Sequence, residues 1–426
     1  MQFNGTIWVE LKKVLLDKSI KYRHVVIEIL LHMRWQIMLE QRDMKNNLTD
    51  DEKYFKLLEE KGYKVFIPDK DSPEALIIET LQNILEVFVG PDDLDINIRV
   101  KIFMINNDMI NAAVCKRGDS YYITIFRGVI NGLRDFILNF VMPNFPYEYF
   151  HTQFEKMYEG QSGIINFFGE MDHEHFQLAN NIANNILFLI VYHEMGHILS
   201  GQQEICLNDV DDFWMESNQN KRGSMLFQAK ELIADYYGMI NSLGICNYRF
   251  HTSFEEYSFY QCIYLISLYS LYIYFERGDD NKICPLGTYE ELFQRSHPHP
   301  AIRLLYMMDL LSGENEYELK QLFKVEWLAK YNEKELFPLI DAMAYGAICE
   351  FSLNLSPEFR LVNKVYEKRT LRLRQLIQNI ASDLCEETYN KVTFVGSLQI
   401  GRVADKYVDD LLQQNDLIGK YDASDE

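Results

Sequence analysis

The sequence lacks an excess of basic residues. Its 42 Lys and Arg residues are outnumbered by 63 Asp and Glu residues, which gives a formal net charge of -21 at pH 7. Nucleic-acid binding needs a positively charged face, so this balance argues against it, although a local basic patch is compatible with the total. We therefore expect no nucleic-acid partner.

Paired cysteines are also missing. Seven cysteines are spread over the 426 residues, and none belongs to a C-x-x-C pair. An odd number of widely spaced thiols is typical of a reducing compartment and offers no cysteine-based zinc site. Residues 1–6 contain neither a basic segment nor a continuous apolar core, so we expect no secretory signal. Together these features predict a cytoplasmic protein.

The sequence has no clear membrane span. One uncharged stretch, residues 259–275, is about one turn shorter than the roughly 20 residues that cross a bilayer comfortably. Its tyrosines are distributed along the stretch instead of gathering at its ends, where interfacial aromatic residues lie. We therefore predict a buried aromatic helix and do not expect a membrane partner.

What the sequence does contain is ordinary for a folded protein. Hydrophobic residues make up 48% of the chain and aromatic residues 14%, which predicts aromatic-rich cores. The length exceeds that of one typical core. We predict an N-terminal helical region (1–70), a central core (71–312) containing an insertion (139–178), and a C-terminal helical region (313–426). Strand-like alternation occurs only within residues 96–126, so the expected class is α+β and predominantly α-helical.

The most informative segment is the run His193-Glu194-Met195-Gly196-His197, at the end of an apolar helix expected over residues 178–199. Two histidines four positions apart lie one above the other on a helix face, so both imidazoles can reach one metal ion. Glu194 lies at the edge of that face, where it can accept a proton from metal-bound water. The run predicts a catalytic metal site. The alternative is a pair of core histidines on a buried helix.

A catalytic zinc site needs a third protein ligand and one open position. Glu231 is the candidate, because it lies on a second helix expected over residues 224–243. Asp235 follows one turn later and could accept the free N–H of a ligand imidazole. Alternatively, both acids form an ordinary solvated pair, or Asp235 pairs with Lys230. We expect the acids of the intervening loop to be solvated: Glu204, Asp209, Asp211, Asp212 and Glu216.

These motifs resemble a known family. H-E-x-x-H followed by residues 231–235 (E-L-I-A-D) is similar to the gluzincin metallopeptidases related to CAAX prenyl endopeptidase and the HtpX-like quality-control proteases. Residues 296–303 (S-H-P-H-P-A-I-R) resemble that family's S/T-H-P-x-x-x-x-R motif. The resemblance covers about residues 95–312. The family's hallmark members are integral membrane proteins, and the long insertion and the terminal helical regions have no counterpart in them.

The resemblance implies a zincin-like core, in which a small sheet accompanies the H-E-x-x-H helix. It implies one Zn²⁺ per chain, held by His193, His197 and Glu231, with Asp235 orienting a ligand histidine. Glu194 would act as the general base in the hydrolysis of a peptide bond.

The resemblance also implies how substrate is held. The oxyanion donor would be His297 or the guanidinium of Arg303; Arg303 could instead buttress the site, and His299 could replace His297. The backbone at Asn111, Ala112 and Ala113 resembles the family's edge strand, which would pair with an extended peptide. Asn111 could equally be only a turn residue.

Two further features have simpler interpretations. His173 and His175 alternate in a polar segment without a third ligand, so we expect a surface loop. The basic residues within 364–374 alternate with apolar ones, which favours an amphipathic helix with a solvated face over a partner site.

The sequence therefore predicts a soluble zinc-dependent endopeptidase acting on a protein or peptide. Two alternatives remain: a host-defence or toxin-type peptidase that cuts one intracellular protein, and a catalytically silent peptidase-like scaffold. The oligomeric state cannot be derived from the sequence.

Overall fold

A computed structural model describes residues 50–70, 72–88, 99–117, 120–150, 174–199, 224–247, 254–277, 291–292, 295, 297–308, 333–355 and 368–391. The chain divides into two compact units, residues 1–57 and 58–426. Helix α3 (Asp50–Glu60) crosses the division. The elements that follow all belong to the second unit.

A mixed sheet of four strands lies in the first part of this unit. Its order is β1-β2-β4-β3. Strand β2 runs parallel to β4, and the pairs β1–β2 and β3–β4 are antiparallel. All seven residues of β4 are buried, as expected for a central strand of β-branched and aromatic residues. The strands are β1 (Val65–Phe66), β2 (Arg99–Ile105), β3 (Ala112–Arg117) and β4 (Ser120–Phe126).

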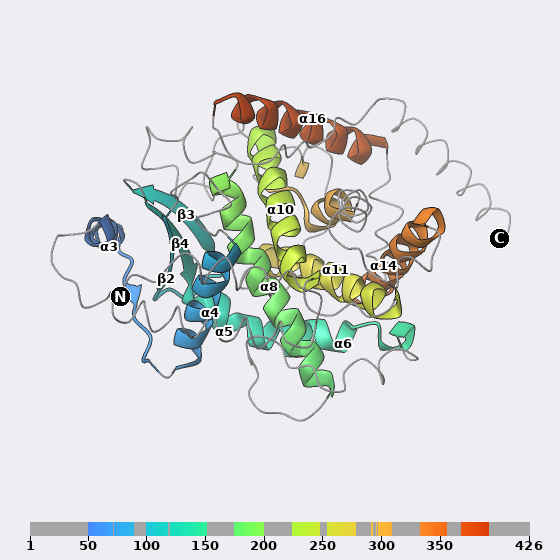
Figure 1. Cartoon of the computed structure of the whole chain (residues 1–426), viewed down its shortest axis with the longest axis horizontal. Coiled ribbons are helices and arrows are strands. Elements are labelled where there is room, and N and C mark those ends of the chain that lie inside the picture. Colours follow the sequence, from blue (N-terminus) through green and yellow to red (C-terminus); the bar gives the residue numbers. More distant parts are fainter. Residues whose placement is uncertain are drawn as a thin grey trace, which may run out of the picture. The chain divides into compact units, whose positions relative to one another are not determined.

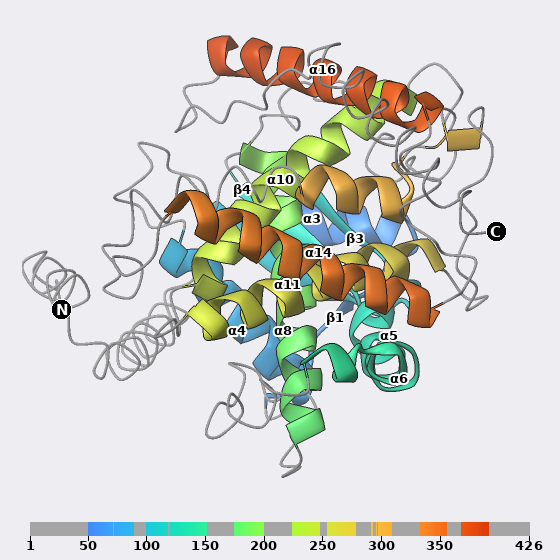
Figure 2. The same cartoon turned by 90° about the vertical axis from the view of Figure 1, so that its right-hand side faces the viewer.

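The other described elements of this unit are helices and helical turns. Helix α8 lies between the sheet and the helices α10 and α11, α14 packs on α11, and α16 packs on α10 (Figures 1 and 2). The bounds are α4 (Pro73–Phe88), α5 (Arg127–Phe136), a π-helical turn (Ile137–Val141), α6 (Met142–Asn144), a 3₁₀ turn (Tyr147–Phe150), α8 (Glu174–Leu199), α10 (Ser224–Asn247), α11 (Phe254–Arg277), α14 (Glu333–Leu355) and α16 (Lys368–Lys391).

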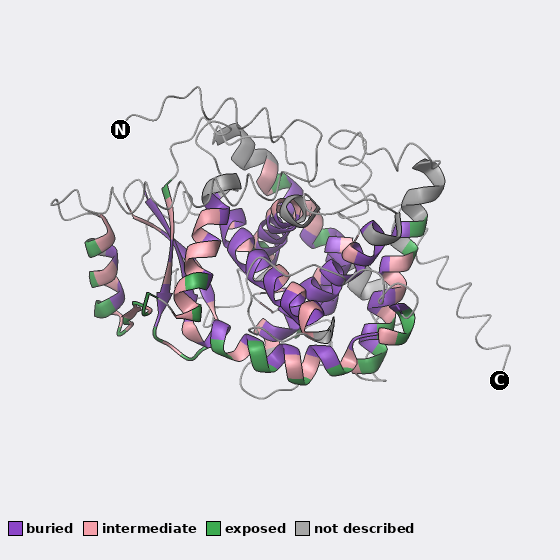
Figure 3. Cartoon of the chain, turned by 60° about the horizontal axis from the view of Figure 1, so that its bottom comes forward, coloured by how far each residue is buried: buried purple, intermediate pink, exposed green. Residues whose placement is uncertain are grey.

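The predicted α+β class, predominantly helical, is confirmed. The expected aromatic helix is α11, which is buried on all sides, and buried residues gather in the middle of the helical layer (Figure 3). Two of its tyrosines form hydrogen bonds inside the protein: the hydroxyls of Tyr264 and Ser242 are 2.5 Å apart, and Tyr274 donates to the carbonyl of Val129 at 2.9 Å. No helix in the described part of the chain has the length and apolarity to cross a membrane.

The segment predicted as an irregular insertion, residues 139–178, is partly regular. Its first residues continue α5 through the π-helical turn and α6 into the 3₁₀ turn, and its last five, 174–178, begin α8. Aromatic packing explains the regular start: Phe145 stacks on Phe150, which meets Phe259 of α11 edge-on. The prolines at 143 and 146 suggested loop. However, the chain stays helical at Pro143, which lies at the start of α6 directly after the π-helical turn.

Helices α8 and α10 approach each other at two glycines. A Cβ atom added at Gly196 of α8 would lie 2.5 Å from the carbonyl oxygen of Ala234. A Cβ at Gly238 of α10 would lie 2.9 Å from the backbone nitrogen of His193. Both contacts are with backbone, which cannot rotate away. The close approach therefore requires glycine at both positions.

We predict that Gly238→Ala destabilises the protein by about 1–3 kcal/mol, because the added methyl group forces the two helices apart. The matched control is Gly346→Ala in α14, where the new Cβ would meet only the hydroxyl end of the half-exposed Tyr149. We expect the control to change stability by about 0.5 kcal/mol or less. Urea denaturation measures both changes. Equal stability of the two variants would contradict the close-packing interpretation.

Candidate metal centre

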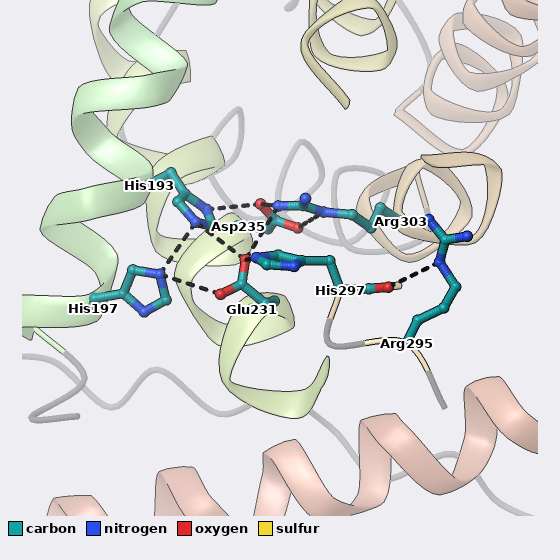
Figure 4. A network of polar contacts seen from close by, with 7 residues as sticks. All are labelled: His193, His197, Glu231, Asp235, Arg295, His297 and Arg303. Carbon is teal, nitrogen blue, oxygen red and sulfur yellow. Dashed lines mark hydrogen bonds and ion pairs between the residues drawn. The ribbon is translucent and has the colours of Figure 1, made fainter. Parts of the chain in front are cut away.

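Three side chains from two helices converge on one point. Helix α8 supplies His193 and His197, and α10 supplies Glu231 (Figure 4). The Nε2 atoms of the two histidines are 3.2 Å apart. The Glu231 carboxylate places Oε2 3.4 Å from Nε2 of His193 and Oε1 3.5 Å from Nε2 of His197. These three residues form a group whose ligand atoms all lie within 4.8 Å of one another.

These separations suit a metal ion. Ligand atoms bound about 2.1 Å from one tetrahedral ion lie roughly 3.4 Å from each other. The three observed separations, 3.2, 3.4 and 3.5 Å, are close to that value, and the two that involve Glu231 use different oxygens of its carboxylate. The cluster could therefore bind a metal ion.

Asp235 orients the first ligand. It lies one helical turn after Glu231, and its Oδ1 atom is 2.8 Å from Nδ1 of His193. This close contact favours an imidazole orientation that presents Nε2 to the cluster. Asp235 is 4% exposed, so this contact lies behind the ligands and is shielded from solvent.

Arg303 holds Asp235 in turn. Its Nε atom donates to Oδ2 at 2.7 Å and its Nη2 atom to Oδ1 at 2.6 Å, a bidentate pair. The guanidinium also lies 4.2 Å from the ring centroid of Tyr272 on α11. Arg303 thus lies behind Asp235, in the buttressing arrangement that was predicted as the alternative to an oxyanion donor.

The buried charges favour a cation at the cluster. Burial alone lowers the pKa of His193, but hydrogen bonds and charge interactions with Asp235 and Glu231 outweigh burial and raise it to about 10. Burial raises the pKa of Asp235, yet the nearby Arg303 and His193 hold it below its usual value. The Glu231 pKa is likewise held low against the effect of burial, by His297 and the two ligand histidines. Two ionised carboxylates therefore face the imidazoles.

His297 lies beside the cluster. Its Nε2 atom is 3.5 Å from Oε2 of Glu231, and its side chain is 36% exposed. It does not belong to the group of three mutually close ligands, so it is placed as a neighbour of the metal position. His299, the predicted alternative, is buried. Its Nδ1 atom accepts the N–H of Ala301, which caps the helix 300–308.

Glu194 is buried, at 7% exposure, on α8 between the two histidines. The proposed substrate strand lies at the edge of the sheet: Ala112 and Ala113 pair with Ile125 and Thr124 of β4. The carbonyl of Asn111 accepts the N–H of Phe126, which extends this ladder by one bond. Strand β3 also packs against α8. The edge and the metal helix are thus neighbours.

The remaining candidate residues lie away from the cluster or outside the described part of the chain. The loop acids between 204 and 216 and His173 lie outside the described residues, and His175 lies in the first turn of α8. Lys230 lies 5.7 Å over the ring of Phe227, while Asp235 pairs with Arg303.

Sequence reasoning missed Gln228, Tyr272 and Gly238. Gly238 could have been found, because it lies seven residues after Glu231 and thus on the same helix face.

No protein-family model, curated protein or solved structure matches this chain. Its function is therefore inferred from the geometry of the cluster itself.

We predict that Asp235→Asn lowers metal affinity by about 10–100-fold, because the ligand histidine loses its charged orienting partner. Competition with a chromophoric chelator measures the affinity. The control is His299→Ala, which removes a buried histidine that does not belong to the cluster. It should cost about 1 kcal/mol of stability as a lost helix cap and leave metal affinity unchanged. An Asp235→Asn protein with wild-type affinity would remove Asp235 from the site.

Proposed function

We propose that the chain is a zinc-dependent endopeptidase with a zincin-like core. The observation that carries this proposal is the convergence of His193, His197 and Glu231 at separations that suit one tetrahedral ion. Two imidazoles and one carboxylate form the ligand set of catalytic zinc in several peptidases. Imidazole also favours zinc over calcium or magnesium, which prefer all-oxygen sites.

A set of three protein ligands distinguishes a catalytic centre from a structural one. Structural zinc sites normally have four protein ligands, whereas catalytic sites keep one position for water. Among the described residues, the ligand group contains three. This favours hydrolysis over the silent scaffold.

When bound, zinc would act as a Lewis acid and lower the pKa of a water molecule toward neutrality. Glu194 accepts a proton from the attacking water and then delivers it to the leaving amine. Asp235 keeps His193 in the tautomer that binds metal, and Arg303 keeps Asp235 ionised. His297, exposed on one side and next to Glu231, donates a hydrogen bond to the oxyanion that forms from the substrate carbonyl.

The edge of β3 is proposed to bind the substrate. An extended peptide can add to an open sheet edge through main-chain hydrogen bonds, so that β3 would align it along α8. Such binding is largely independent of side chains and is common for peptidases that cut extended segments. Asn111, Ala112 and Ala113 lie at the start of this edge.

The order of motifs supports the same conclusion. The pair His193 and His197, the pair Glu231 and Asp235, and the pair His297 and Arg303 come from three separate segments. The distances above bring all three segments into one polar network (Figure 4). This is the arrangement expected if the resemblance to gluzincin peptidases reflects a shared mechanism. The host-defence alternative differs only in its single protein target.

We predict that Glu194→Gln retains metal and lowers peptide cleavage by about 10²–10⁴-fold, because the variant cannot accept a proton. Metal content is measured on purified protein, and cleavage on a mixture of peptides from a digested cell extract. Glu350→Gln, an exposed substitution of the same kind on α14, is the control and should cleave at the wild-type rate. Full activity of Glu194→Gln would refute its role. Metal binding without cleavage by either protein would favour the scaffold.

A further inference from the structure

Gln228 bonds the segment that precedes His297. It lies on α10, three residues before the ligand Glu231, and is 1% exposed. Its Nε2 atom donates to the carbonyl oxygens of Leu292 at 3.1 Å and Arg295 at 2.8 Å. Both N–H bonds of one buried amide are therefore used on Leu292 and Arg295, and we call the described residues Leu292, Arg295 and His297 the histidine loop.

A second anchor acts on the same loop from another helix. Arg295 forms an ion pair with Glu276 in the last turn of α11. Its Nε atom also donates to the carbonyl oxygen of His297 at 3.3 Å. The backbone on which His297 stands is thus fixed from α10 and from α11.

This double attachment matters because the His297 side chain is partly exposed to solvent. It is 36% exposed, and its Nε2 atom lies 3.5 Å from Oε2 of Glu231. A donor that stabilises a developing charge must be held in place before the reaction, and a displacement of about 1 Å can cost two orders of magnitude in rate. The bonds that hold the backbone near His297 therefore contribute to this precision.

Gln228 and Glu231 share one helix, less than one turn apart. Any movement of α10 that displaces the ligand carboxylate also displaces the two carbonyls that Gln228 holds. We propose that Gln228 is a positioning residue that sets the place of His297 relative to the metal ligand Glu231. This inference rests on the proposed function and deepens it.

If Gln228 had only a structural role, its replacement would have a different effect on anion binding. Two carbonyls that lose their donor would destabilise the fold, but the group that stabilises an anion beside the metal would be unchanged. Anion binding at the metal therefore separates the two roles, independently of any substrate.

The test uses the full chain loaded with Co²⁺, whose visible spectrum reports on its ligands, and acetohydroxamate as the probe. Acetohydroxamate binds a metal through two oxygens and places negative charge where the oxyanion would form. The variants are Gln228→Met, which keeps the volume and removes both donors, His297→Ala, and the two combined. Gln261→Ala removes an equally buried glutamine from α11 and serves as the control.

We expect Gln228→Met to bind Co²⁺ as tightly as the wild type and acetohydroxamate about tenfold more weakly, the effect of losing one charge-assisted hydrogen bond. His297→Ala should weaken the probe to a similar extent. The double variant should be little worse than either single one, because both changes remove the same interaction. Gln261→Ala should bind both ligands normally.

Unchanged acetohydroxamate affinity in Gln228→Met, with a loss in His297→Ala, would overturn the positioning role and leave the proposed function intact. A wild-type protein that fails to bind Co²⁺ would overturn both. If Gln228→Met does not fold, Glu276→Gln decides the question. That variant loosens the second anchor at a side chain that is 22% exposed. It should weaken the probe in the same direction, and wild-type affinity would overturn the inference.

Discussion

The centre depends on how closely α8 and α10 approach each other. Ligand atoms from the two helices must come within about 3.4 Å of one another to share an ion, and the short Glu231 side chain reaches the histidines only if the backbones nearly touch. Gly196 against Ala234 and Gly238 against His193 permit that approach. A side chain at either position would occupy the space between the helices. The glycines therefore belong to the metal site as much as the ligands do, although neither contributes an atom to it.

The second constraint is electrostatic. Glu231 and Asp235 are ionised and almost fully buried, and Arg303 compensates for one of the two charges. Without further compensation, the remaining negative charge draws a proton to His193, whose pKa is raised to about 10. A metal ion bound at the cluster would take the place of that proton. Under the proposed function the two buried acids have different roles within one helical turn: Glu231 is a ligand and Asp235 orients His193.

Sequence periodicity predicted the four central residues of the candidate site but not the residues that hold them in place. His193, His197, Glu231 and Asp235 could be found because helical spacing alone places them on shared faces. The strands within residues 96–126 and the long helices were likewise visible as alternation and as apolar runs. Gln228 and Tyr272 could not be found, because they act on residues more than thirty positions away, through contacts that only the folded chain creates. For the same reason the sequence left the role of Arg303 open, whereas its bidentate pair with Asp235 places it behind the ligands.

The topology of the sheet has a consequence for the order of folding. Strands β3 and β4 are joined by a two-residue connection and pair antiparallel. Strand β2 pairs parallel with β4, although β3 lies between them in the sequence. Local hairpins form within microseconds, and pairing between distant segments is slower because more chain entropy is lost first. We therefore expect the β3–β4 hairpin to form before β2 pairs with β4. Among the described residues no further strand pairs with the outer edge of β3, so during folding this edge can pair with another chain until it is covered.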